Sequence, residues 1–247
     1  REIALPAHAG ALSADEIAAR KPYVSDTARL LGDVPGFSFY TSGGISSLPV
    51  IRGLNDDRIR ISVDGMTLTS ACANHMNPPL SYIDPANVGR VTAVAGITPV
   101  SLGGDSIAGT IVIDSRAPVF AGAGEGIVKG GRIAGFHRSN GSATAVNLGA
   151  SLASESLSLS YTGAAARSDN HEAGDGRVVK STRYETRNHA VSFAARGQDR
   201  LLVVNAGRQG IPEQAYPNAY MDMVANDAVF GNVRYDALYG WGRLEAR

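Results

Sequence analysis

The chain has 247 residues, which allows one or two domains, and its 23 basic residues balance 23 acidic ones. The zero net charge gives no reason to expect nucleic acid as a partner. Its 29 glycines and its charged fraction of only 19% are typical of a β-rich chain with many turns. A single cysteine excludes an intrachain disulfide, and no apolar run is long enough to predict a transmembrane helix.

Residues 13–31 predict two short helical segments. Ser13 and Glu16 have the spacing of a capping box, in which each side chain binds the backbone N–H of the other residue. Ser25 and Asp26 precede the second segment as candidate caps.

Strands follow in the same part of the chain. Ile59, Ile61 and Val63 alternate with polar residues and lead into the turn Asp64-Gly65, which predicts a half-buried strand. The stretches RVTAVAG and GTIVIDS predict two more strands, joined by a glycine-rich connection. Up to about residue 117 the pattern is therefore mixed α/β.

After residue 124 the pattern changes to alternation with a period of two. Leu157, Leu159 and Tyr161, for example, alternate with serine and threonine. About seven strands are predicted, at residues 125–137, 143–153, 156–168, 184–196, 200–209, 227–236 and 239–247.

The connections between these strands alternate between short turns and long polar loops, with the long loops at 169–183 and 210–226. Outer-membrane β-barrels have this arrangement, and their strands are longer than those of soluble sandwiches. A sheet with a free edge is not stable in lipid. We therefore expect the chain to be the N-terminal portion of a longer barrel protein.

Two segments resemble motifs of the TonB-dependent outer-membrane receptors. LPVIRGLNDDRIRISVDGM (48–66) is similar to the first plug motif, and IDPANVGRVTAVAGITPVSLGGDSIAGTIVIDSR (83–116) is similar to the second. Thr92 stands where the family usually has Glu. The resemblance implies an α+β plug followed by the first strands of an antiparallel barrel of about 22 strands. The implied divisions are an N-terminal segment at 1–20, a plug at 21–119 and barrel strands at 120–247.

The family resemblance also implies a location and partners. The protein is expected in the bacterial outer membrane, in contact with its lipid, and coupled to the TonB energy-coupling complex of the inner membrane. The nearest candidate for the TonB-binding segment is REIALPA at residues 1–7.

The stretch CANHMNPP contains the only cysteine of the chain and one of its four methionines. Thiolate and thioether sulfur are soft donors that favour Cu(I) over hard cations. If residues 72–76 form a helical turn, Cys72 and Met76 lie on one face at i and i+4. His75 would point away from that face and is the weaker candidate.

The same stretch resembles the copper receptors within the family, which pair a plug Cys-x-x-x-Met with a second pair in the barrel. The resemblance makes Cys72 and Met76 the plug ligands and Met221 and Met223 the barrel ligands of a copper ion. In an extended segment, residues at i and i+2 share one face. Asp222 between them is predicted to point to the opposite side and to be solvated.

The favoured hypothesis is thus a receptor, not an enzyme, that captures copper as Cu(I) through sulfur ligands at its outer mouth and imports it. One alternative is a receptor for a siderophore or another metal chelate, in which the sulfur atoms are incidental. A second alternative is a β-rich surface module that binds without transport. Each sulfur pair taken alone is also compatible with ordinary packing.

Overall fold

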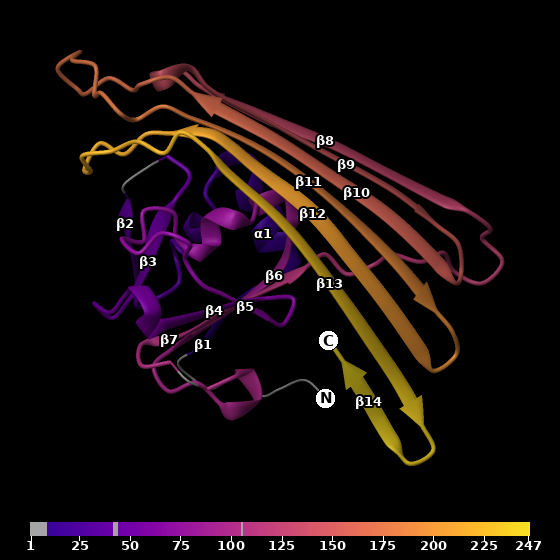
Figure 1. Ribbon diagram of the computed structural model, residues 1–247. Helices are drawn as coiled ribbons and strands as arrows, with labels where there is room; N and C mark the ends of the chain where they lie inside the picture. The colour runs from indigo at the N-terminus through magenta and orange to yellow at the C-terminus, as the bar shows by residue number, and fades with distance from the viewer. Residues whose placement is uncertain (1–8, 42–43, 105) are drawn as a thin grey trace.

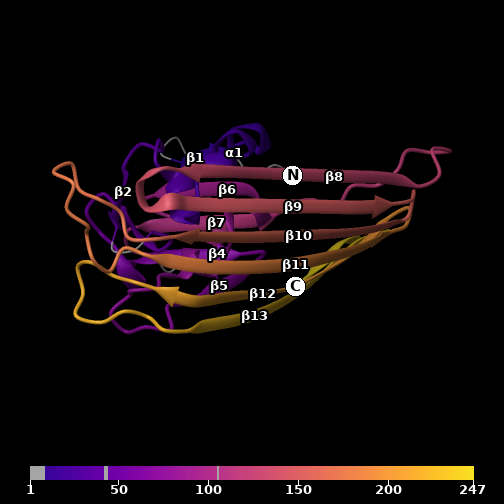
Figure 2. The ribbon, with the colours of Figure 1, turned by 90° about the horizontal axis from the view of Figure 1, so that it is seen from above.

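The computed structural model describes residues 9–41, 44–104 and 106–247. A mixed α/β part comes first, and a sheet of long antiparallel strands follows it (Figure 1). Seen from above, strands β8 to β13 lie side by side over the first part (Figure 2). We call the first part, residues 9–115, the plug, and the long-stranded sheet, residues 128–246, the wall. The stretch REIALPA lies outside the described residues.

The plug contains two sheets and a set of short helices. Its main sheet has the order β1 (Ala9–Leu12), β6 (Val88–Ala95), β7 (Gly109–Ser115), β4 (Ile59–Val63), β5 (Met66–Leu68). A separate hairpin consists of β2 (Phe37–Thr41) and β3 (Ser47–Ile51). The helices are α1 (Ala14–Arg20) and the 3₁₀ turns η1 (Lys21–Tyr23), η2 (Thr27–Leu31), η3 (Asp56–Arg58), η4 (Pro79–Tyr82), η5 (Pro85–Asn87) and η6 (Val100–Leu102).

The predicted capping box at the start of α1 is confirmed. The Glu16 carboxylate accepts from the Ser13 backbone N–H at 2.8 Å, and the Ser13 hydroxyl accepts from the Glu16 N–H at 3.2 Å. The second predicted segment is a 3₁₀ turn, η2, and not an α-helix. Its cap is Asp26, which accepts from the Ala28 N–H and also from the Ser47 N–H of β3. This shared cap attaches the turn to the neighbouring hairpin.

The core of the plug forms where β6 and β7 pack against the helices. Ile17, Ile111 and Val91 belong to one cluster of buried apolar side chains. Gly109 begins β7 with φ at 146°, a conformation that favours glycine, and a Cβ added there would lie 2.1 Å from the carbonyl oxygen of Val94. Glycine at this position therefore allows β7 to approach β6 closely enough to pair.

The wall is a seven-stranded antiparallel sheet. Its strands are β8 (Val128–Arg138), β9 (Ala143–Ala153), β10 (Leu157–Ser168), β11 (Tyr184–Arg196), β12 (Arg200–Gln214), β13 (Asn226–Tyr239) and β14 (Gly242–Ala246), with the turn η7 (Asn140–Ser142) between the first two. The predicted bounds of β9 and β11 agree with the structure, whereas β12 continues five residues further than predicted, to Gln214.

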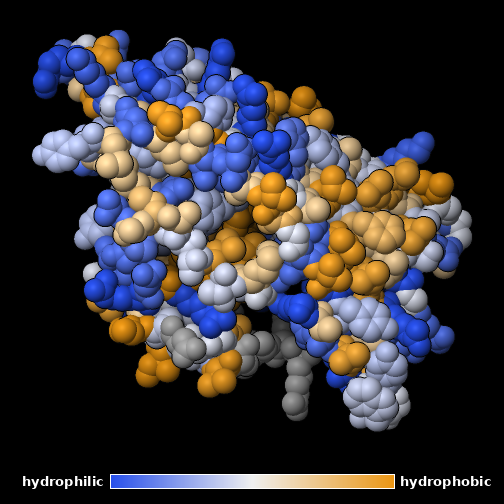
Figure 3. Space-filling view, viewed as in Figure 1, coloured by the Kyte–Doolittle hydropathy of each residue, from blue (hydrophilic) through white to orange (hydrophobic). Residues whose placement is uncertain are grey.

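The two faces of the wall differ in polarity. Leu148, Leu159 and Phe193 are exposed on the face turned away from the plug, while Ala145 and Ala194 on the other face are buried. Apolar side chains gather over the long strands, and the end with the long loops is largely hydrophilic (Figure 3). No helix in the described part of the chain has the length and apolar character that crossing a membrane requires.

Side-chain amides of the wall hold the plug. Gln209 donates to the Ser81 carbonyl oxygen at 2.5 Å, Asn188 to the Asp84 carboxylate at 3.1 Å, and Asn232 to the Asp64 carbonyl oxygen at 3.1 Å. We call this set of contacts the seam. It shows that the inner face of the wall is polar where it meets the plug, as the alternation predicts.

Two buried ionisable side chains, Asp84 of the seam and Lys21, have shifted pKa values. Burial raises the pKa of Asp84 to about 6. A hydrogen bond from the Ala86 N–H and the charge of Lys21 act in the opposite direction. Burial also lowers the pKa of Lys21 to about 7, and the charges of Arg116 and Arg132 act in the same direction. The Lys21 ammonium donates to the Val88 carbonyl oxygen at the start of β6. Both groups are therefore less readily ionised than in water.

We expect Gly109→Ala to destabilise the plug by more than Gly53→Ala. Gly53 also has a positive φ, at 83°, but a Cβ there meets nothing within 4 Å, so it carries only the backbone cost of about 1–2 kcal/mol. At position 109 the contact with the Val94 carbonyl adds to that cost. Hydrogen exchange of the β6 and β7 amides measures the difference, and equal losses in the two variants would contradict it.

The stability of the plug is expected to depend on pH through Asp84. The pKa of Asp84 is raised in the folded state. The contribution of this carboxyl to the free energy of unfolding is therefore fully present below its ordinary pKa of 3.8, and it is lost as the pH rises through about 6. Asp84→Asn removes this loss, which amounts to about 3 kcal/mol. The measurement is the opening free energy of the β6 amides from hydrogen exchange between pH 4 and pH 7. Asp15→Asn, at an exposed carboxylate of α1, is the control, and parallel pH curves for the wild type and Asp84→Asn would refute the assignment.

Candidate functional site

The predicted plug ligands lie in the segment between β5 and η4, which forms an irregular loop. Its central feature is a turn in which the His75 N–H donates to the Cys72 carbonyl oxygen at 2.9 Å, and His75 has a positive φ of 50°. Residues 72–76 are therefore not a helical turn, and the expected i, i+4 placement of Cys72 and Met76 on one helix face is wrong. Both side chains are half-buried.

Hydrogen bonds within the loop fix its shape. The Ser70 hydroxyl donates to the Cys72 carbonyl oxygen at 2.9 Å and lies 3.2 Å from the Cys72 N–H as an acceptor. The Tyr82 hydroxyl accepts from the Ala71 N–H at 2.9 Å. Pro78 and Pro79 lead directly into η4. The backbone at the free cysteine is thus held by side chains on both sides of it.

The imidazole of His75 faces carboxylates. Its Nδ1 lies 4.0 Å from an Asp56 oxygen, and its Nε2 lies 3.8 Å from an Asp57 oxygen. Both distances are longer than a hydrogen bond, so the imidazole lies beside the two carboxylates without being hydrogen-bonded to them. Among the described residues, no group of three or more His, Cys, Asp and Glu side chains is arranged to hold a metal ion.

The predicted barrel ligands lie in the connection between β12 and β13. Met223 pairs with Gln214 through two backbone hydrogen bonds of 2.8 and 2.9 Å. Its side chain is half-buried and packs against a cluster of Ile45, Ala145, Ala166, Tyr184 and Ile211. Met221, by contrast, is 61% exposed. The two methionines therefore have different surroundings.

The structure brings the plug loop and this connection together. The Gln214 side-chain amide donates to the Ser46 hydroxyl, and that hydroxyl donates to the Met76 carbonyl oxygen at 3.2 Å. Gln214 is also the backbone partner of Met223. Met76 and Met223 are thus joined through two residues, although they are far apart in the sequence.

Tyr216 is a further residue of this region that the sequence did not indicate. Its side chain is 1% exposed, and its hydroxyl lies 3.9 Å from the Met223 sulfur. Burial raises the pKa of Tyr216 to about 12, the charges of Cys72, Tyr82 and Asp222 act in the same direction, and a hydrogen bond with Ser46 opposes them. The phenol therefore stays protonated at neutral pH and lies among groups from both the plug and the wall.

Asp222 is exposed, as predicted, but it also organises the connection. One carboxylate oxygen accepts from the Tyr216 N–H at 3.0 Å, and the other accepts from the Ser181 hydroxyl at 3.1 Å. Because Asp222 separates the two methionines, these bonds fix the backbone from which both project.

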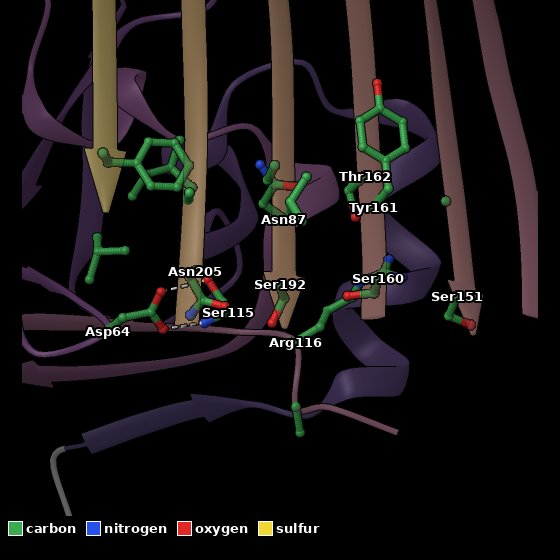
Figure 4. Close-up of a pocket in the computed structure, with 18 of the residues that line it drawn as sticks. Asp64, Asn87, Ser115, Arg116, Ser151, Ser160, Tyr161, Thr162, Ser192 and Asn205 are labelled. Carbon is green, nitrogen blue, oxygen red and sulfur yellow. Dashed lines mark hydrogen bonds between the residues drawn. The ribbon is translucent and has the colours of Figure 1, made fainter. Parts of the chain in front are cut away.

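A cavity of about 530 Å³ lies between the plug and the inner face of the wall. Hydroxyls of Ser151, Ser160 and Ser192 reach toward it from three wall strands, and Arg116 enters it from the segment that follows β7 (Figure 4). The Asp64 carboxylate at its edge accepts from the N–H and the hydroxyl of Ser115 at 2.8 and 2.7 Å. The lining as a whole is more apolar than polar, because side chains such as Leu68, Ile83 and Phe230 line the cavity beside these hydroxyls.

Comparisons with known proteins agree with this architecture. Residues 1–110 match the family model described as TonB-dependent Receptor Plug Domain. The solved structure of the copper transporter OprC is similar over 96% of this chain, with a TM-score of 0.83 and 27% sequence identity. The chain spans 36% of that protein's length.

Other similar structures transport or bind different cargo. The iron transporter FrpB from Neisseria meningitidis matches over 96% of this chain and 38% of its own, with a TM-score of 0.78 and 16% identity. The siderophore receptor PirA from Pseudomonas aeruginosa matches over 98% of this chain and 39% of its own, with a TM-score of 0.65 and 17% identity. At these identities the likeness shows the fold alone.

No curated protein matches the chain in sequence. The evidence for its family is instead the plug match, together with a wall sheet that continues the plug as it does in these receptors. Residues 1–110 are thus a plug domain of the TonB-dependent receptor type, and the antiparallel strands after it have the arrangement of the first barrel strands in such receptors of the bacterial outer membrane.

Proposed function

We propose that the protein is a receptor that captures copper, as Cu(I), at its outer mouth and imports it across the outer membrane. Cys72 and Met76 of the plug and Met221 and Met223 of the wall would be the ligands. Import would leave the cargo chemically unchanged, so we do not propose that the protein is an enzyme. Energy would come from the TonB complex of the inner membrane, as is usual for this family.

The observation that carries the proposal is the connection between Met76 and Met223 through Ser46 and Gln214. It puts the two sulfur-bearing segments on opposite sides of one contact between plug and wall. Thioether and thiolate donors favour Cu(I), and the likeness to a copper transporter at 27% identity supports the same cargo.

The two wall methionines would have different tasks. Met221 is exposed beside the long loops and would meet the ion first. Met223 is half-buried against a cluster that includes Ile45 of the plug, and it would complete the site with the plug ligands. Because the site consists of parts from both domains, a movement of the plug would separate its ligands and release the ion toward the cavity below.

A receptor for a siderophore or another chelate is the second candidate, because the iron and siderophore receptors among the similar structures share this fold. In that case the outer loops would bind the chelate and the sulfur atoms would have no part in binding. The plug match disfavours the third hypothesis, a surface module without transport, because a plug domain is typical of the transporting receptors.

The copper site can be tested by removing the two plug sulfur atoms one at a time. We expect the full chain, purified in detergent and loaded with Cu(I), to retain copper against a competing chelator. Cys72→Ala and Met76→Ala should each lose at least tenfold in affinity, because a soft donor is lost from a small set. Metal analysis after dialysis measures the copper retained per protein.

Met66→Ala is the matched control for this experiment, since Met66 lies in β5, outside the proposed ligand set. It should retain the copper of the wild type. Equal amounts of copper retained by the wild type and by the two plug variants would contradict the proposed copper site. Binding of a ferric chelate by all of the variants would then favour the siderophore alternative.

A further inference from the structure

We infer that Tyr216 is a positioning residue of the copper site, which orients the Met223 thioether toward the plug ligands by a hydrogen bond from its phenol. The inference rests on the proposed function and deepens it. It assigns a role to a residue that contributes no metal ligand and that the sulfur pattern does not reveal.

The location of Tyr216 is unusual for a loop residue. It follows β12 by two positions, in the connection that carries the exposed residues Tyr220 and Met221, yet its side chain is almost fully buried. Its backbone is held at both ends of the turn, because its N–H donates to Asp222 and its carbonyl oxygen accepts from the Ala219 N–H at 3.1 Å. Burial of the ring and these two backbone hydrogen bonds together define its position.

The phenol contacts both halves of the site. Its hydroxyl is within hydrogen-bonding distance of the Met223 sulfur, at 3.9 Å. It also forms a hydrogen bond with Ser46, the residue that links Gln214 to the Met76 carbonyl. Tyr216 thus has polar contacts with Met223 of the wall and with Ser46 of the plug.

The chemistry of a thioether explains what this contact does. Methionine has three rotatable side-chain bonds, so an unrestrained sulfur samples many positions. The sulfur is a weak hydrogen-bond acceptor with more than one lone pair, so it can accept from the phenol and still present a lone pair to a soft cation. Groups that orient a metal ligand in this way typically change metal affinity by about 10- to 100-fold when they are mutated.

Packing alone is the competing explanation for a buried tyrosine in this connection. Tyr216→Phe separates the two, because it keeps the ring and removes only the hydroxyl. We expect Tyr216→Phe to weaken Cu(I) binding by about 10- to 100-fold, measured on the full chain in detergent by competition with a Cu(I) chelator. Tyr220→Phe removes a hydroxyl from a fully exposed ring in the same connection and should leave the affinity unchanged.

A double-mutant cycle tests whether the phenol acts through Met223. In a Met223→Leu background the sulfur is absent, so Tyr216→Phe should have no further effect on Cu(I) affinity. X-ray absorption at the copper edge gives a second measurement: one Cu–S contact should be lost or lengthened in Tyr216→Phe. A purely structural role would weaken binding equally in both backgrounds and leave the sulfur count unchanged, which would overturn the inference.

The outcomes also separate the inference from the proposed function. A wild-type chain that binds no Cu(I) overturns both. A wild-type chain that binds Cu(I) with an affinity that Tyr216→Phe does not change keeps the copper receptor and removes only the role of Tyr216.

Discussion

Polar groups that are buried between plug and wall need hydrogen-bond partners, and the position of the plug against the wall depends on these hydrogen bonds. A plug enclosed by strands cannot leave its carbonyl groups to bulk solvent, because an unpaired buried polar group is costly. Amides on the inner face of β11, β12 and β13 meet this requirement at Ser81, Asp84 and Asp64. Alternation along each wall strand provides those amides on one face and apolar side chains on the other.

The same requirement brings the candidate site together. Gln214 is the last residue of β12 and reaches the plug at Ser46, which lies 168 positions earlier in the chain. The segments that carry Met223 and Met76 are therefore joined by this contact between plug and wall and not by any local pattern.

Much of the fold was predictable because its signals are local. The capping box at Ser13 needs only four consecutive residues, and the alternation that defines β9 and β11 reports directly on which face of the strand is buried. The candidate site was predictable only as a set of residue types. The positive φ of His75 and the hydrogen bonds of the Ser70 hydroxyl determine the shape of the plug loop, and neither can be read from the spacing of Cys72 and Met76.

Long-range contacts explain the remaining differences. Neither Ser46 nor Tyr216 stands out in the sequence, since a serine in a polar stretch and a tyrosine in a loop are both ordinary. Their importance comes from partners that the wall supplies after folding. A spacing rule for α-helices also misplaced Cys72 and Met76, because it assumes a regular backbone, whereas His75 has a positive φ and the Ser70 hydroxyl binds the backbone of Cys72.

The backbone pair between Gln214 and Met223 has a consequence for how such receptors can diverge. It closes the intervening residues 215–222 into a loop of fixed register, attached to the end of the β12–β13 ladder. An insertion at the exposed tip, around Tyr220, would lengthen the loop without disturbing its base. A single inserted residue between Met223 and β13 would instead disturb the register, since neighbouring positions in an extended strand face opposite sides. Variation in loop length is therefore expected at the tip, while the spacing at the base is constrained.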